Sequence, residues 1–226
     1  MSPLRPVYIL LFFVAASCRP IQYKQSTNTS LPELGTLGIY TTYLLGNDYQ
    51  PKTITNLFEP VRLQWEEIKI QKREIFIKKD SLSQTQKDSI LISFKVLDKV
   101  GLLKQINADK ELMKYLRKNE KYRLISQVTV HFPKAILQEV QSSDEVYLIQ
   151  SKAKTLSLSL LKNNKVFNQI EFTDGKIVKF RTTEFCWGLN KRREPEIFDL
   201  VPDGTECSGD TYKSAKKVEK KNEFKF

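Results

Sequence analysis

The sequence predicts an α+β fold, with a mainly antiparallel sheet and two short central helices in a single domain. Three observations indicate this class. Segments rich in β-branched and aromatic residues recur along the chain, and turn residues separate many of them. Asp98 and Asp109 each precede a stretch of helical character. No strong boundary and no clear repeat interrupts residues 37–212, which we interpret as the globular domain.

The first strands are expected near the start of this domain. Residues 37–45 are aromatic and β-branched, and a turn signal, Gly-Asn-Asp at 46–48, follows them. Apolar side chains alternate along much of 61–79, but their register changes after Trp65 and again after Ile70. We therefore expect two strands in 61–79, separated by a break or a bulge.

A further strand and the two helices come next. Residues 90–97 alternate and are β-branched, which favours a strand over a helix, and we expect a hairpin with 74–79. Asp98 has the position of an N-cap before KVGLLKQIN, and Asp109 has the same position before KELMKYLRKN. The apolar residues of the second stretch recur at helical spacing. We interpret them as packing on the domain's own core, with a membrane-lying or partner-binding helix as the alternative.

The C-terminal half is predicted to consist mainly of strands. Residues 135–141 are compatible with one short helix. Asn163-Asn164 and Asp174-Gly175 are turn signals, and the second favours a hairpin. The expected strands lie at 122–132, 145–150, 155–161, 165–172 and 176–185, and the last three would form a meander.

The N-terminus has the three zones of an export signal. Residues 1–6 carry a single charge, on Arg5, residues 7–16 are all apolar, and the small residue Ser17 then precedes Cys18. The apolar run has about ten residues, whereas a transmembrane helix needs about 20. We therefore expect residues 1–17 to be a signal peptide that is removed. A retained anchor helix and a buried element of the fold are the alternatives.

The segment Ala15-Ala16-Ser17-Cys18 resembles the lipobox of bacterial lipoproteins. The resemblance implies that the thiol of Cys18 receives a diacylglycerol and that the leader is cut just before it. It covers only about the first 20 residues. Ala15 stands where the pattern usually has Leu, Val or Ile, so an ordinary signal peptidase cutting after Ala16 is the alternative. Residues 18–36 are polar and contain two prolines, and we interpret them as a lipid-anchored flexible tether.

The cysteine count is consistent with lipid on Cys18. The chain has three cysteines, and Cys186 and Cys207 form an even pair if Cys18 carries lipid. An exported protein meets an oxidising compartment, so we expect a disulfide between Cys186 and Cys207, with two reduced thiols as the alternative. Their spacing differs from the CxxC of redox enzymes, and no zinc-binding cluster accompanies them.

The chain is basic, with 37 Lys and Arg against 26 Asp and Glu and a formal net charge of +11. Such a charge suggests nucleic acid in general, but export makes a nucleic-acid partner improbable, and we expect none. The polyanions outside the cytoplasm are phospholipid headgroups, lipopolysaccharide phosphates and acidic glycans. An anionic lipid or glycan is therefore one candidate partner, and a charge that only maintains solubility is the alternative.

The sequence places its candidate binding residues near Cys186. Trp187 adjoins that cysteine, and cationic side chains lie nearby at Arg181, Lys191, Arg192 and Arg193. An aromatic ring beside cations suits a sugar, a lipid phosphate or a protein partner, whereas a tryptophan that packs over a disulfide is the structural alternative. We expect an irregular loop at 188–206, pinned by the disulfide, and a basic mobile tail at 213–226.

Little in the sequence suggests catalysis. His131 is the only histidine, so a histidine-rich metal site is excluded and a general base would need a partner that the sequence does not reveal. We find no G-x-S-x-G elbow, no P-loop and no dinucleotide-binding motif, and we expect no cofactor. The neighbouring carboxylates of Glu66 and Glu67 would point to opposite faces of a strand.

These observations predict a non-enzymatic envelope lipoprotein that serves as a binding or assembly module of a membrane-associated complex. The alternatives are an envelope hydrolase acting on glycan or lipid, and a lipoprotein that shields or immobilises something at the cell surface. Arg19 follows the cysteine, which differs from the Asp-based signal for retention in the inner membrane of enteric bacteria. The resemblance therefore favours the outer membrane.

Overall fold

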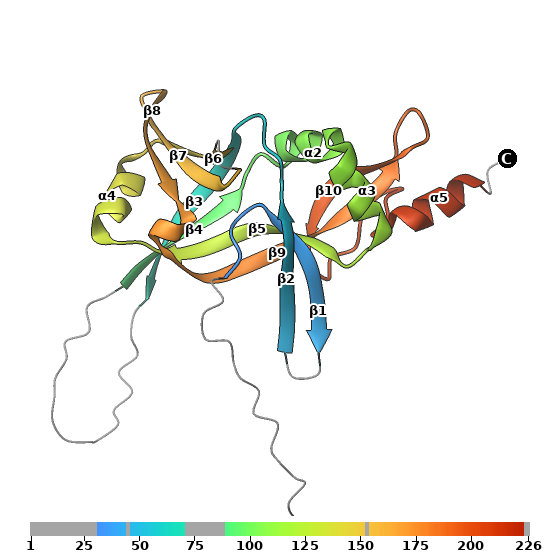
Figure 1. Ribbon diagram of the computed structural model, residues 1–226, viewed down its shortest axis with the longest axis horizontal. Helices are drawn as coiled ribbons and strands as arrows, with labels where there is room; N and C mark the ends of the chain where they lie inside the picture. The colour runs from blue at the N-terminus through green and yellow to red at the C-terminus, as the bar shows by residue number, and fades with distance from the viewer. Residues whose placement is uncertain (1–30, 44–45, 71–88, 152–153, 224–226) are drawn as a thin grey trace, which may run out of the picture.

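The computed structural model describes residues 31–43, 46–70, 89–151 and 154–223. Within these ranges the chain forms one curled sheet whose strand pairs are all antiparallel (Figure 1). The strands are β1 (Thr36–Tyr43), β2 (Gly46–Ile54), β3 (Val61–Ile70), β4 (Ser89–Val96), β5 (Tyr122–His131), β6 (Glu145–Gln150), β7 (Leu156–Lys162), β8 (Lys165–Glu171), β9 (Lys176–Leu189) and β10 (Pro195–Pro202).

The strand order is β10-β9-β5-β4-β3-β6-β7-β8. The hairpin of β1 and β2 branches from β5, because β1 pairs with Tyr122–Leu124 and β4 pairs with Gln127–Val130 on the same edge of that strand. The segment that leads into β1 fills the concave side of the curl. There Leu34 is fully buried, and Gly35 donates its N–H to the carbonyl of Ile125. The folded part therefore includes residues that the sequence assigned to the tether.

The helices are α2 (Lys99–Ala108), α3 (Lys110–Lys118), α4 (Lys134–Ser142) and α5 (Ala215–Glu223), with a 3-10 turn η1 at Phe172–Asp174. Both predicted N-caps are confirmed: Asp98 accepts from the N–H of Gly101 at 2.8 Å, and Asp109 accepts from that of Leu112 at 2.9 Å. The buried apolar residues form one cluster, whose members range in sequence from Leu34 to Val218. The predicted α+β class with a mainly antiparallel sheet is confirmed. Beyond the two central helices, α4 matches the short helix expected at 135–141, whereas α5 was not expected.

Two expected features of the N-terminal half are wrong. Residues 46–48 lie inside β2 rather than in a turn, and pair with the end of β1. The strand β3 continues past Trp65 without a break, in unbroken register with β4 from Leu63 to Ile70. The side chains of residues 66–69 are exposed, so β3 leaves the core there and the alternation of apolar residues no longer indicates its register. β4 pairs with β3, and its expected partner at 74–79 lies outside the described part, as does all of 71–88.

The expected hairpin at Asp174-Gly175 is also wrong, because β8 pairs only with β7 and β9 lies between β5 and β10. A hairpin turn of the expected type needs a left-handed glycine, but Gly175 has φ −130 and ψ −179, which is extended. A Cβ on Gly175 would lie 2.6 Å from the ring of Phe132, so the glycine permits close packing instead. The other turn is confirmed, since Asn163 and Asn164 have φ of 52 and 60 and join β7 to β8.

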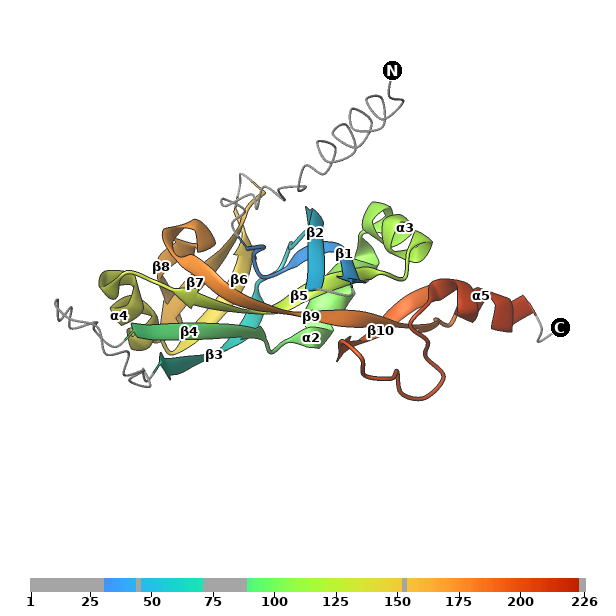
Figure 2. The ribbon, with the colours of Figure 1, turned by 90° about the horizontal axis from the view of Figure 1, so that it is seen from below.

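The C-terminal region is more regular than the sequence suggests. The segment 188–206, expected to be a loop, contains the end of β9 and the whole of β10, which pair with each other. The segment 213–226, expected to be a mobile tail, contains α5, whose Ala215 and Val218 are 3% exposed. The helix forms because these two apolar residues, three positions apart, share one helical face that covers the end of the core. Figure 2 shows α5 continuing the long axis of the sheet beyond β10.

Candidate binding surface at the β9–β10 hairpin

A β-bulge in β10 directs one phenylalanine into solvent. Ile197 pairs with Trp187 and Asp199 pairs with Cys186, so Phe198 is an extra residue without a partner on β9. Its side chain is 50% exposed, whereas Ile197 and Leu200 on either side are about 2% and 1% exposed. A β-bulge commonly turns a side chain away from the direction that regular strand pairing would give it. Phe198 is therefore a large apolar group held outward by the backbone.

Phe198 stands between two adjoining hollows in the surface, of about 410 and 500 Å³, which share Leu189 and Phe198 as their common wall. Gly188 lies under the ring, and a Cβ there would be only 2.9 Å from the phenyl Cδ2. The absence of a side chain at Gly188 thus sets the position of the ring. We call the residues that line the two hollows the Phe198 surface: Gly188, Leu189, Asn190, Lys191, Arg192, Glu194, Glu196, Phe198, Asp210, Thr211, Tyr212, Val218 and Lys221.

Charges of both signs surround the ring. The hairpin turn contributes Lys191 and Arg192 on one side, and both are exposed. On the other side Lys221 of α5 lies 3.2 Å from the carboxylate of Asp210 and 2.7 Å from the hydroxyl of Tyr212. These two hydrogen bonds raise the pKa of Lys221, the bond to Tyr212 contributing most. The Phe198 surface is therefore an apolar centre with a rim of mixed charge.

The structure brings together only some of the predicted binding residues. Lys191 and Arg192 line one hollow, and Arg193 is in the same turn with φ 62. Trp187 is 2% exposed and belongs to the core, which agrees with the packing alternative for this residue. Arg181 and Leu189 are eight residues apart on the same strand, or about 26 Å. Arg181 instead lines a small pocket with residues of β3, β4 and β5.

The predicted disulfide between Cys186 and Cys207 is present, with the two Cα atoms 5.6 Å apart. It attaches the segment after β10 to β9. One residue beyond Cys186, the backbone of Trp187 exchanges hydrogen bonds of 2.7 and 2.8 Å with that of Tyr212. The covalent bond and this bridge together hold the chain that leads into α5. They therefore support one wall of the Phe198 surface.

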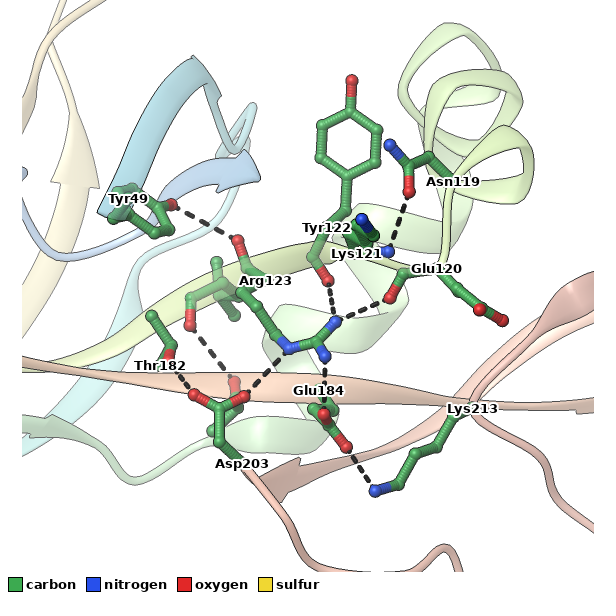
Figure 3. A network of polar contacts seen from close by, with 12 residues as sticks. Tyr49, Asn119, Glu120, Lys121, Tyr122, Arg123, Thr182, Glu184, Asp203 and Lys213 are labelled. Atoms are coloured by element: carbon green, nitrogen blue, oxygen red, sulfur yellow. Dashed lines mark hydrogen bonds and ion pairs between the residues drawn. The ribbon is translucent and has the colours of Figure 1, made fainter. Parts of the chain in front are cut away.

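A partly buried ion-pair network holds the same segment to β9 (Figure 3), and its residues Thr182 and Glu184 share a strand face with Cys186 because they alternate with it along the strand. Arg123 of β5 lies 2.6 Å from Glu184 of β9 and 2.9 Å from Asp203, just after β10. Lys213 lies 2.7 Å from the second oxygen of Glu184, and Thr182 donates to Asp203. The hydrogen bond to Glu184 is the main cause of the raised pKa of Lys213. Because every charge has a partner of opposite sign, we interpret the network as structural.

Sequence reasoning missed Phe198 and the contribution of α5. The signal for β10 was the alternation of buried Ile197 with exposed neighbours, but the bulge at Phe198 shifts that alternation by one residue. The flanking prolines and glycine also favoured a loop. Nothing local indicates that Tyr212 and Lys221 lie beside the end of β9, because the bridge from Tyr212 to Trp187 joins residues distant in sequence.

A larger groove of about 880 Å³ lies at the opposite end of β9. Its walls are formed by Leu31–Glu33, the end of β2 and the start of β9, and Phe172 also lines it. A third groove, of about 480 Å³, lies between β2 and α3 and contains Tyr115, Tyr122, Asp109 and Glu111. In that groove both oxygens of Asp109 are engaged, by the N–H of Leu112 and the amide of Asn56.

The described residues show no arrangement typical of a catalytic centre around His131. This residue is exposed at the end of β5, and no hydrogen bond to its ring is found within the described ranges. Those ranges also contain no group of three or more metal-ligating side chains and no helix long and apolar enough to cross a membrane. Cys18 lies outside the described residues.

Comparison with known proteins identifies no relative: no family model, curated protein or solved structure matches the chain significantly.

Proposed function

We propose that this chain is an envelope lipoprotein, anchored by lipid on Cys18, whose domain binds a protein partner and serves as an assembly module of a membrane-associated complex. The observation that carries this proposal is Phe198, half exposed at a bulge and set between two hollows. Exposed aromatic anchors beside small pockets are typical centres of protein–protein interfaces. The outer membrane is the proposed location, on the evidence of Arg19 after the cysteine.

The charge around Phe198 supports a protein partner over a polyanion. Lys191 and Arg192 are matched by Glu194 and Glu196 in the same hollow. Such a mixed rim gives an approaching polyphosphate or acidic glycan little net attraction. It suits a protein surface that presents charges of both signs, because complementary pairs at the rim set orientation and exclude wrong partners.

The bonds that hold the Phe198 surface in place are also consistent with a role in binding. The disulfide and the Arg123 network fix the segment 203–213 to β9 at several points. A surface that is rigid before binding loses little conformational entropy on association. We therefore expect the Phe198 surface to have the same shape with and without its partner.

The test is affinity capture of the full protein from detergent-solubilised membranes, comparing the parent with Phe198→Ala and Phe167→Ala. Phe167 is a matched control, because it is 43% exposed and is also unpaired at a bulge, on β8. We expect a stoichiometric membrane protein with the parent and the control, and its loss with Phe198→Ala. Equal recovery with all three proteins, or no partner in several detergents, would contradict the proposal. The intact mass of the mature protein tests lipid on Cys18 separately.

An envelope hydrolase acting on glycan is the second candidate, favoured by the groove between β2 and α3. Its two tyrosines and the carboxylate of Glu111 resemble the lining of a sugar site in kind, with Asp109 beside them. Because Asp109 caps α3, its carboxylate is not free to serve as the second carboxylate of a hydrolase. Glu111 would therefore have to act alone. Release of soluble sugar from purified peptidoglycan by the parent, and its loss in Glu111→Gln, would favour this candidate.

A further inference from the structure

A groove of about 880 Å³ lies far from the Phe198 surface. Its walls include Lys176 and Val178 at the start of β9, whereas the Phe198 surface adjoins Leu189 at the end. The two ends of β9 are 13 residues apart in sequence, or about 40 Å for an extended strand. The groove and the Phe198 surface are therefore separate places on the molecule. The groove's volume of about 880 Å³ is within the range of small-molecule sites.

The lining of this groove is mainly apolar and comes from three segments distant in sequence. The N-terminal segment, β2 and the start of β9 form the walls, and the buried ring of Phe172 lies among them. Val178 is 41% exposed, so an apolar side chain of β9 lies open to water. The apolar residues of the lining are Leu31, Pro32, Pro51, Ile54, Phe172, Ile177 and Val178.

Two lysines from different strands line the groove. Lys52 belongs to β2 and Lys176 to β9, and both side chains are exposed. The one acidic side chain in the lining is Glu33. Burial, and to a lesser degree the nearby charge of Glu171, raise the pKa of Glu33. Lys52 and Lys176 outnumber this one carboxylate, so the lining presents a net positive charge to an anionic ligand.

We propose that this groove binds a long-chain fatty acid anion, with the acyl chain along the apolar lining and the carboxylate between Lys52 and Lys176. An acyl chain gains free energy in proportion to the apolar area that it buries, and the lining offers such area without demanding hydrogen bonds. A carboxylate gains charge-assisted contacts from lysine ammonium groups. The proposal goes beyond partner binding and does not depend on it.

The experiment is photolabelling of the full protein, purified in a non-ionic detergent, with diazirine-bearing palmitate. Labelled peptides are identified by mass spectrometry, and diazirine-bearing hexadecanol is the uncharged comparison probe. We expect saturable palmitate labelling confined to peptides that contain residues 31–36, 51–54 and 172–178. Palmitate labelling is expected to exceed hexadecanol labelling at least threefold, because the alcohol lacks the charge that the lysines bind.

Variants locate the site. Val178→Asp places a carboxylate in the apolar lining and is expected to lower palmitate labelling at least fivefold. Val166→Asp on β8 is the matched control, because Val166 is 57% exposed and outside the groove, and should label like the parent. Replacing Lys52 and Lys176 by Glu together is expected to reduce palmitate labelling to the level of hexadecanol. The equivalent change at Lys162 and Lys165, in the β7–β8 turn, should have no effect.

Three results would overturn the proposal: labelling spread over the whole chain, equal labelling by palmitate and hexadecanol, or parent-like labelling of Val178→Asp. Circular dichroism of each variant excludes loss of the fold as the cause of reduced labelling. A negative result at this groove does not affect the capture experiment at Phe198, because that experiment uses neither of the two probes and none of these residues.

Discussion

The guanidinium of Arg123 lies 2.6 Å from the carboxylate of Glu184, although the two residues are 61 positions apart in sequence. Their side chains are 16% and 9% exposed, so the pair is largely shielded from water. Arg123 also donates to the carbonyls of Glu120 and Tyr122, and Tyr49 donates to the carbonyl of Arg123 itself. The arginine thus connects β5 to β9, to the chain after β10 and to the β1–β2 hairpin.

We expect Arg123→Met to lower the free energy of unfolding by about 3 kcal/mol. The substitution leaves the buried Glu184 with Lys213 alone and removes one partner of Asp203. Glu184 keeps Lys213 as a partner, so the loss comes from the charged hydrogen bonds that Arg123 makes to Glu184, Asp203 and two backbone carbonyls. Urea denaturation followed by circular dichroism measures the change.

The matched control is Lys221→Met, which breaks the exposed ion pair with Asp210 and the exposed hydrogen bond to Tyr212. The Asp210 side chain is 93% exposed, and surface pairs of this kind contribute little to stability. We expect no measurable change in unfolding. If both variants unfold like the parent, the Arg123 network is not a structural clamp.

The disulfide is expected to stabilise the domain by about 3 kcal/mol in the chain-entropy model, because it closes a loop with a sequence separation of 21. The double substitution of Cys186 and Cys207 by Ala should reproduce the loss seen on adding a reductant. Denaturation of the parent with and without reductant, beside the double variant, makes the comparison. If the reductant also lowers the stability of the double variant, its effect on the parent has a cause other than the loss of this disulfide.

Local signals predicted the elements whose hydrogen bonds are local. Asp98 and Asp109 cap helices because a side-chain oxygen accepts from an N–H three residues ahead, and that spacing is visible in the sequence. The strand β2 was missed because Pro51 and exposed polar residues interrupt it. An edge strand tolerates proline, since one of its edges makes no ladder hydrogen bonds.

The candidate site could be predicted only in part. The disulfide followed from the cysteine count, and Lys191 and Arg192 were recognised as a cationic cluster. The exposed ring of Phe198 depends on a bulge, and a bulge follows from the pairing of two strands rather than from either strand alone. The Arg123 network was invisible for the same reason: Arg123 and Asp203 are 80 positions apart, and only the order of β5, β9 and β10 brings them together.

Gly188→Ala is expected to weaken partner capture by moving the Phe198 ring. The added Cβ would lie 2.9 Å from that ring and 3.4 Å from Thr211, so the phenyl group must shift. Overpacking of this size lowers stability by about 1 kcal/mol. Gly204→Ala is the control: its Cβ meets nothing within 4 Å, but its φ of +80 strains an alanine by a similar amount. We expect similar losses of stability and a loss of capture for Gly188→Ala alone.

Glu33→Gln is expected to stabilise the protein at neutral pH. Burial, followed by the charge of Glu171, raises the pKa of Glu33 above its usual value of 4.5 in the folded state. Between the unfolded and folded pKa values the native state binds more protons, so its stability falls as the pH rises through this interval. Below 4.5 the carboxyl is protonated in both states and its charge no longer opposes folding.

The stability difference between Glu33→Gln and the parent should therefore be greatest at pH 7 and disappear as the pH falls below 4.5. Urea denaturation of both proteins at pH 4 and pH 7 measures it. Glu171→Gln removes the weaker of the two causes and should give a smaller difference with the same sign. A constant difference at both pH values would show that the substitution acts through packing rather than through the charge of Glu33.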